Sequence, residues 1–203
     1  DNGSKLRVYH LLRSLAARHR VTLLSFAFAT ARPEEAGPWQ EWGVEVQAVP
    51  LNPFEANRAG ALRTFLSPRP VVSRPIAAMS RLVADRLQTT AFDAVIASTQ
   101  MMADYALQAP SATARILEEH NSMARWMGER YREQINLLQR LRCWASWQKS
   151  RRYEARLFRR FDLVTMVSGQ DRAVCRTDLP GYCGRVEVVP NGVDCAHNRP
   201  GLA

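Results

Sequence analysis

The amino-acid sequence predicts a single α/β domain in which parallel strands form a doubly wound sheet with helices on both faces. The first observation behind this prediction is that short apolar runs alternate along the chain with longer segments of helical periodicity. The second is composition: 203 residues, 46% apolar and 23% charged, are enough to bury a core. This balance excludes disordered and fibrous proteins.

Each strand of the sheet is predicted by a short apolar run between segments of helical periodicity. The run at 20–28 is almost continuously apolar, which is typical of a strand covered on both faces. Several later runs end in polar residues, so that polar groups stand where the strand ends. The expected strands are residues 20–28, 44–50, 92–98, 114–120, 162–168 and 185–190.

Helices are predicted where apolar side chains recur three or four residues apart. Ser4 is a suitable N-cap for the first helix, Pro75 suits the first turn of a later one, and Ser98 and Thr99 can cap the next. The stretch from 122 to 161 is long enough for two helices or one kinked helix. The expected helices are residues 5–19, 33–42, 57–66, 75–90, 100–109, 122–161 and 169–179.

The net charge of +9 is concentrated in one segment. Between Arg125 and Arg160 there are eleven Lys or Arg residues against three Glu, so this segment alone carries +8. Aromatic and aliphatic residues are interleaved with these cations. The pattern fits an amphipathic helix on an anionic membrane surface, and equally a helix whose aromatics face the core while its arginines face water.

Cysteine spacing and the lack of long apolar runs limit the environment of the chain. Its four cysteines are 32, 8 and 12 residues apart, which matches no C-x-x-C redox or zinc pattern. No apolar run approaches the roughly 20 residues of a membrane span, and the chain does not open on a signal peptide. We therefore expect reduced thiols in a cytoplasmic protein.

Polar side chains follow several of the predicted strands. In a parallel sheet, the carboxyl ends of the strands border the ligand crevice. Glu118, Glu119, His120 and Asn121 close one strand, and adjacent carboxylates on a strand point to opposite faces, so that only one can share a cleft with His120. Ser98 and Thr99 follow another strand and Ser168 a third, where helix capping explains them equally well.

The chain resembles the N-terminal half of a retaining, group 1 glycosyltransferase of family 4, which has the GT-B architecture of two Rossmann-like domains. Four segments carry the resemblance: residues 3–25, the strand ending in "EEHN" at 118–121, "FDLVTMVSGQDRAV" at 161–174, and "VVPNGVD" at 188–194. In that family the last motif opens the interdomain linker. Pro190 and Gly192 suit the role, because proline stops a strand and glycine accepts a sharp turn.

The resemblance implies how the chain is organised. Residues 1–190 are expected to form a Rossmann-like acceptor-binding domain with its basic helical segment at about 121–160. Residues 191–203 are expected to begin the linker, with the donor-binding domain outside this sequence. This fragment alone is therefore expected to be inactive. The sequence departs from the family pattern at its start, where the glycine loop is reduced to Gly3 and no strand precedes it.

The resemblance also implies a chemistry. The substrates would be a nucleotide sugar and a carbohydrate or lipid-linked acceptor, with neither cofactor nor metal. His120 is the expected catalytic residue, because an imidazole in the cleft can hydrogen-bond a sugar hydroxyl or developing charge. The expected substrate-binding residues are Gly3, Lys5, Arg7, Ser98, Thr99, Glu119, Asn121 and Ser168.

Other functions would require motifs that can be looked for in the sequence. A Rossmann-type oxidoreductase would need G-x-G-x-x-G after its first strand, and the sequence has no such run. Nucleic acid is not an expected partner, since no recognised binding motif accompanies the basic segment. The alternative that stays open is a non-catalytic α/β domain that binds carbohydrate or anionic lipid. For the transferase, we expect a cytoplasmic enzyme that is peripheral at the inner face of the membrane.

Overall fold

The computed structural model describes residues 3–27, 37–53 and 75–192 of the chain. The predicted helix at 57–66 and the first residues of the one at 33–42 lie outside this part. In chain order the elements are α1 (Gly3–Ala16), β1 (Thr22–Ala27), α2 (Gly37–Glu41), β2 (Glu45–Pro50), α4 (Ala77–Thr89), β3 (Ala94–Ser98), α5 (Ala103–Ala106), β4 (Ala114–Glu118), α6 (Met123–Glu133), α7 (Leu137–Phe158), β5 (Leu163–Met166), α8 (Gly169–Thr177) and β6 (Val186–Val188).

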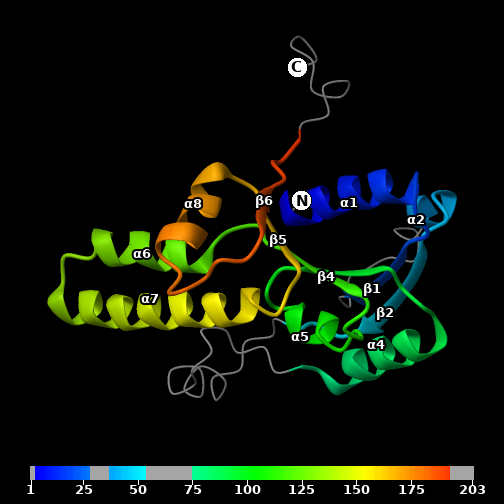
Figure 1. Cartoon of the computed structure of the whole chain (residues 1–203), viewed down its shortest axis with the longest axis horizontal. Helices are drawn as coiled ribbons and strands as arrows, with labels where there is room; N and C mark the ends of the chain where they lie inside the picture. The colour runs from blue at the N-terminus through cyan, green and yellow to red at the C-terminus, as the bar shows by residue number, and fades with distance from the viewer. Residues whose placement is uncertain (1–2, 28–36, 54–74, 193–203) are drawn as a thin grey trace, which may run out of the picture.

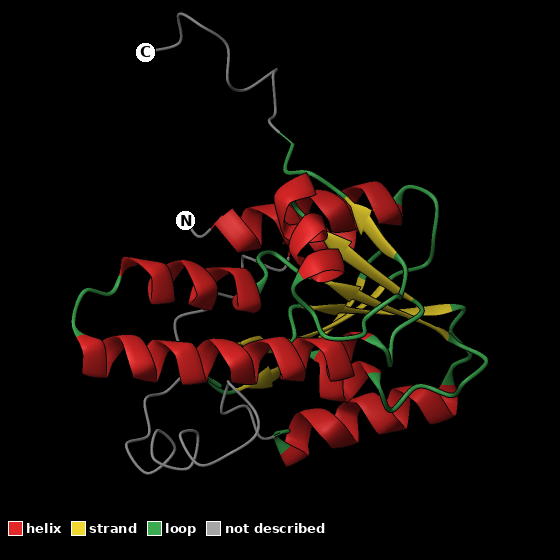
Figure 2. Cartoon of the chain, turned by 60° about the vertical axis from the view of Figure 1, so that its left-hand side comes forward, coloured by secondary structure: helices red, strands yellow, loops and turns green. Residues whose placement is uncertain are grey.

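The described strands all pair in parallel, which confirms the predicted α/β class. They form two sheets, β1–β2 and β3–β4–β5–β6. Helix α1 lies on one side of the strands, and α4 and α5 lie on the other (Figures 1 and 2). Helices therefore cover both faces, as expected of Rossmann-like domains.

The main core lies between the larger sheet and the helices that follow its strands. Leu117 of β4, Val164 and Met166 of β5, and Phe158 of α7 are all fully buried. A smaller cluster joins Met79 and Val83 of α4 to Tyr105 of α5 and to the β1–β2 sheet. Every residue of β5, and every residue of β4 after Ala114, is at least partly buried, which explains why these central strands read as short apolar runs rather than as alternating ones.

The basic segment forms an antiparallel pair of helices, α6 and α7, which projects from one end of the molecule (Figure 1). Asn136 separates the two helices and caps α7, because its Oδ1 accepts hydrogen bonds from the N–H groups of Leu138 and Gln139. At Gly128 an added Cβ would lie 3.0 Å from Nε1 of Trp147, so the glycine lets the helices approach closely. Of the two predicted arrangements, two separate helices are observed.

Each described helix is too short or too polar to cross a lipid bilayer.

Candidate functional site

A polar cluster lies where β3 and β4 end, next to α1 and to the turn after β6. Parallel pairing places Ser98, the last residue of β3, directly beside Glu118, the last residue of β4. His120 follows two residues later, and Arg7 reaches the same point from α1. Three of the predicted site residues, Arg7, Ser98 and His120, thus meet at these strand ends, and Glu118 lies between them.

Glu118 holds the cluster together by accepting three side-chain hydrogen bonds. Its Oε1 accepts from Nε of Arg7 at 2.6 Å, and its Oε2 lies 2.8 Å from Oγ of Ser98 and 2.9 Å from Nε2 of His120. Burial raises the pKa of this carboxyl, but the hydrogen bonds from His120, Arg7 and Ser98 outweigh burial and lower the pKa to about 2. Glu118 is therefore an anion at neutral pH.

The ionised Glu118 fixes the ring of His120. A carboxylate can only accept hydrogen bonds, so Nε2 of His120 must carry the proton in this contact. Oγ of Ser98 lies 3.3 Å from the same nitrogen. The side chain of His120 keeps 12% of its surface exposed. When the ring is neutral, Nδ1 therefore carries no proton and can accept a hydrogen bond. The carboxylate of Glu118, on the other side of the ring, fixes its orientation.

Arg7 connects this cluster to the turn after β6. Its Nη1 donates to the carbonyl of Pro190 at 3.2 Å and to Oδ1 of Asn191 at 2.9 Å. Its Nη2 is buried and finds no hydrogen-bond partner among the described residues. One buried guanidinium thus spans three elements: α1, the end of β4, and the segment that the resemblance identifies as the start of the linker.

Thr99 carries backbone strain beside the cluster. Its φ is +71°, in the left-handed region that a β-branched residue rarely adopts. Its N–H donates to the carbonyl of Glu118 at 2.7 Å, which fixes the turn where β3 ends. Strained residues of this kind cost about 1–3 kcal/mol and gather at functional sites.

The structure does not bring Glu119 to this cluster, in contrast to the sequence prediction. Glu119 points to the other side of β4, where it is 4% exposed, accepts a hydrogen bond from the backbone N–H of Gln100 and lies near Glu154. Burial and the carboxylates of Glu154 and Glu118 raise the pKa of Glu119 well above its usual value. The carboxylate that shares the cleft with His120 is Glu118, because residues two apart on a strand share a face.

The remaining predicted residues are spread around the cluster. Gly3 is the first residue of α1 rather than part of a loop before it, and both Gly3 and Lys5 are exposed. Asn121 is exposed immediately after His120. Ser168 caps α8, accepting from the N–H of Asp171 at 3.1 Å, and lies outside the Glu118 cluster.

A buried carboxyl on α7 braces the chain just beyond Asn121. Glu154 accepts hydrogen bonds from Oγ of Ser122 and from the N–H of Ala124, both at 3.1 Å. Burial raises the pKa of Glu154 to about 7, against the lowering effect of these donors. The brace holds the start of α6, and with it the loop that carries His120, against α7.

Among the described residues, no group of three His, Cys, Asp or Glu side chains is arranged to hold a metal ion. The chemistry that the cluster itself offers is hydrogen bonding. It presents an imidazole oriented by a carboxylate, beside a hydroxyl and a guanidinium, at the carboxyl ends of parallel strands. Such groups bind hydroxyls or oxyanions and stabilise charge that develops on a bound molecule.

Comparison with known proteins identifies the family. No curated protein matches the chain. A comparison with protein families matches residues 2–197 to Glycosyltransferase Family 4, and this match includes all four segments on which the resemblance rests. The chain therefore belongs to glycosyltransferase family 4.

Proposed function

We propose that this chain is the acceptor-binding half of a retaining GT-B glycosyltransferase, which moves a sugar from a nucleotide sugar to an acceptor. The observation that supports the proposal best is the Glu118 cluster, in which an ionised carboxylate orients His120 at the carboxyl ends of β3 and β4. Family membership supplies the reaction class. The donor-binding domain is proposed to follow the turn at Pro190–Asn191, which Arg7 ties to the same cluster.

In this proposal His120 is the group that contacts the reacting sugar. With Nε2 bonded to Glu118, Nδ1 can accept a hydrogen bond from a hydroxyl, and a protonated ring can donate one to developing negative charge. Asn121 follows His120 in the chain, Thr99 donates its backbone N–H to the carbonyl of Glu118, and Lys5 precedes Arg7 by two residues on α1. Arg7 was expected to bind substrate, but it is buried and bonded to Glu118. In this scheme it therefore acts, with Glu118, as a positioning residue for His120, and neither side chain touches substrate.

The acceptor is proposed to be a carbohydrate or a lipid-linked sugar, and the enzyme to be cytoplasmic and peripheral at the inner face of the membrane. The basic character of α6 and α7 supports this location. Transfer is proposed to need neither metal nor cofactor, and nucleic acid is not proposed as a partner. The 203-residue chain alone is proposed to be inactive, since it would hold only one side of the cleft.

The direct test is sugar transfer by the natural full-length protein. A panel of nucleotide sugars would be screened for release of nucleoside diphosphate, and the anomeric configuration of the product would be read by proton NMR. We expect turnover that survives EDTA, with retention. We expect His120→Ala to lower kcat/KM by about 100-fold or more, whereas the matched control His19→Ala, at an exposed position in the turn between α1 and β1, leaves it unchanged.

Two results would contradict the proposal. Full activity of the His120→Ala protein would remove His120 from the reaction. Binding of carbohydrate with no release of nucleoside diphosphate from any donor would favour the alternative, a non-catalytic carbohydrate-binding or lipid-binding domain.

A further inference from the structure

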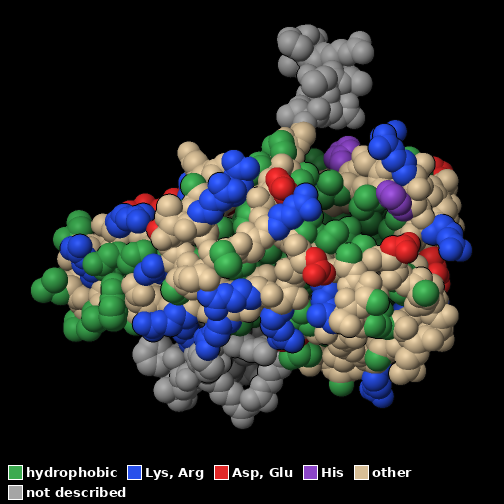
Figure 3. Space-filling view, in the orientation of Figure 1, with side chains coloured by type: hydrophobic (Ala, Val, Ile, Leu, Met, Phe, Trp, Pro, Cys, Tyr) green, Lys and Arg blue, Asp and Glu red, His purple; other side chains and the backbone are tan. Residues whose placement is uncertain are grey.

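The free end of the α6–α7 hairpin, residues 134–144, exposes an unusual amount of apolar surface; we call it the hairpin tip. Ile135, Leu137 and Leu138 are 95%, 80% and 81% exposed. Leu141 and Trp144 are also exposed. Figure 3 shows hydrophobic side chains gathered at this end of the molecule with Lys and Arg beside them. Single exposed leucines are ordinary, but a contiguous apolar patch marks a surface that meets another apolar phase.

The apolar residues of α7 lie on one side of the helix. At 3.6 residues per turn, Leu137, Leu138, Leu141 and Trp144 fall within a sector of about 120°. Arg140 and Arg142 lie on either flank, each about 40° outside its edge. Both arginines are exposed. A helix in the plane of a membrane interface has this arrangement, with an apolar stripe facing the acyl chains and long cationic side chains reaching up to the headgroups.

From the start of the hairpin tip into α7 the charge has a single sign, while on the α6 side the exposed Arg132 and Glu133 offset each other. From residue 134 to residue 153 the sequence contains no Asp or Glu and five Lys or Arg: Arg140, Arg142, Lys149, Arg151 and Arg152. Aromatic rings accompany the cations, with Arg130 5.2 Å from the ring centroid of Trp126 and Arg140 5.2 Å from that of Tyr131. An anionic surface is the complement of such a patch.

We propose that the hairpin tip is a membrane anchor: Leu137, Leu138, Leu141 and Trp144 insert at the boundary between headgroups and acyl chains of an anionic phospholipid leaflet, and Arg140 and Arg142 contact the lipid phosphates. The exposed aliphatic side chains favour lipid over nucleic acid as the partner. Nucleic acid is bound by aromatic stacking and hydrogen bonds, whereas exposed leucines gain little from contact with it. The positive charge disfavours docking of the tip on the tip of a second copy of this chain, because such a contact would bring like charges together.

The anchor would set the distance between the membrane and the candidate site. Helix α6 begins three residues after His120 and runs toward the hairpin tip over 11 residues, or about 16 Å. The inference deepens the proposed peripheral location by naming the residues that make contact, but the docking itself does not rest on sugar transfer. A protein that transfers sugar and ignores vesicles would overturn the anchor and leave the proposed function standing.

The test is co-sedimentation of the purified 203-residue chain with phospholipid vesicles that contain no sugar acceptor. One set consists of phosphatidylcholine, and the other of equal parts phosphatidylcholine and phosphatidylglycerol. We expect binding to the anionic vesicles and little to the neutral ones. Leu138→Ser with Leu141→Ser should weaken the partition coefficient at least about tenfold, because two leucines lose their apolar environment.

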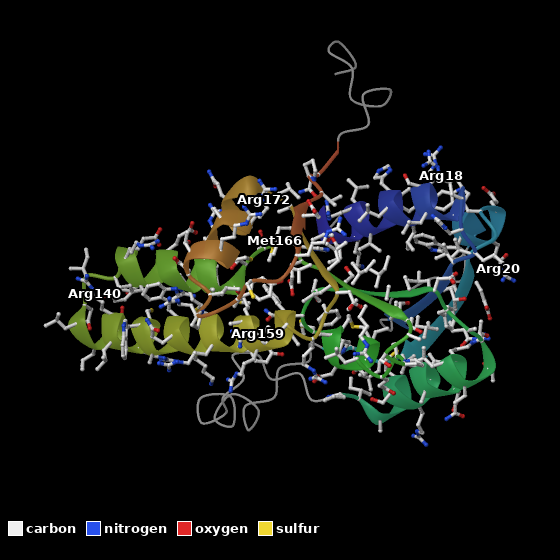
Figure 4. All side chains as sticks on the ribbon, viewed as in Figure 1. Arg18, Arg20, Arg140, Arg159, Met166 and Arg172 are labelled. Atoms are coloured by element: carbon white, nitrogen blue, oxygen red, sulfur yellow. The ribbon has the colours of Figure 1, made fainter. Side chains whose placement is uncertain are left out.

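Two double variants distinguish the contribution of the tip arginines to vesicle binding from that of the net positive charge of the chain. Arg140→Gln with Arg142→Gln removes two cations from the hairpin tip. Arg18→Gln with Arg20→Gln removes two exposed cations at the opposite end of the molecule (Figure 4). We expect about tenfold weaker binding for the first pair and no more than about twofold for the second. Circular dichroism would verify that each variant is folded, which is the expected result for substitutions at exposed positions.

Several outcomes would overturn the anchor. One is that wild-type protein fails to bind anionic vesicles. Another is that the two arginine pairs weaken binding equally while the leucine pair has no effect, which would indicate diffuse attraction rather than insertion. A third is that the wild-type chain self-associates without lipid and the leucine variant is monomeric, which would make the tip an interface between copies.

Discussion

Glu118 and Glu119 are adjacent in the chain and both are buried, yet the two sides of β4 give them opposite charge states. The pKa of Glu118 falls to about 2, whereas the pKa of Glu119 is raised well above its usual value. Glu118 meets a guanidinium, an imidazole and a hydroxyl. Glu119 meets one backbone N–H and other carboxyls, and its Oε1 has no partner among the described residues.

Hydrogen-bond and ion-pair partners, rather than depth of burial, decide the charge of these two carboxyl groups. Burial disfavours the anion at both positions, and only on the Glu118 side do enough donors converge to reverse it. The Glu118 side also holds the exposed edge of His120 and the turn at Pro190. One side of β4 is thus organised to hold an anion and orient an imidazole, whereas on the other side the pKa values of the buried Glu119 and Glu154 are raised.

The largest effect is expected from Glu118→Gln. The substitution leaves the buried guanidinium of Arg7 without its counter-ion, and breaking a buried ion pair in this way costs about 3–5 kcal/mol. Guanidinium chloride unfolding at pH 7 would measure the loss. The control is Glu119→Gln, which should cost far less because that carboxyl is already favoured in its neutral form. Equal costs for the two variants would contradict the contrast between the two sides.

The pH dependence of this loss follows from the sign of the shift. The pKa of Glu118 is lower in the folded chain than in the unfolded one, so its contribution to stability is present above about pH 4.5 and is lost as the pH falls toward 2. The gap between wild type and Glu118→Gln should therefore narrow as the pH falls through that range. A gap that stays constant would mean that Glu118 is not the ionised partner of Arg7.

Glu154→Gln, on the Glu119 side of β4, is expected to change the free energy of unfolding by an intermediate amount and in the opposite direction, toward higher stability. The folded pKa of about 7 lies above the unfolded value, so the contribution of Glu154 to stability is present below about pH 4.5 and is lost as the pH rises toward 7. Glutamine keeps an acceptor for Ala124 and cannot ionise. The variant should be more stable than wild type at pH 8, by roughly 1–3 kcal/mol.

Thermal unfolding at pH 4 and at pH 8 would measure this difference. The matched control is Glu187→Gln, whose carboxylate is exposed on β6 and which should leave the melting temperature unchanged at both values. A Glu154→Gln protein that is less stable than wild type at pH 8 would show that the ionised carboxylate is tolerated in the brace.

The smallest effect is expected from Ser98→Ala. It removes one of the three donors to Glu118 and leaves the ion pair with Arg7 in place, so the cost should be about 1 kcal/mol. The pKa of Glu118 should rise by the loss of that hydrogen bond, which a carbon-13 NMR titration of the carboxyl would detect. An unchanged titration would mean that Ser98 contributes nothing to holding the charge.

The sequence predicted the fold well because the fold rests on local patterns. All six expected strands are found, since each is a short apolar run between helical segments, and the strand-end rule led to Ser98 and His120. The two-sheet arrangement is set by which strands pair, and a single sequence carries little information on that. Arg7 and Asn191 are 184 positions apart in the chain, so their contact is also invisible to any local pattern.

The side-chain period of a strand distinguishes Glu118 from Glu119. Adjacent strand residues point to opposite faces, and the same rule places Glu118, two residues before His120, on the face of that histidine. The period alone therefore identifies the correct carboxylate. Gly3 could not be assigned in this way, because its expected loop was inferred from resemblance, and in this chain helix α1 already begins at that residue.

Whether Glu118 orients the imidazole can be read from the tautomer of His120, which the nitrogen-15 shifts of its ring report in the labelled 203-residue chain. The spectra would be recorded at a pH where the ring is neutral, and His120→Gln would assign the signals. If Glu118 orients the imidazole, the ring is protonated at Nε2 and bare at Nδ1. A ring protonated at Nδ1, with Nε2 bare, would contradict that hydrogen bond and, with it, the positioning role of Glu118.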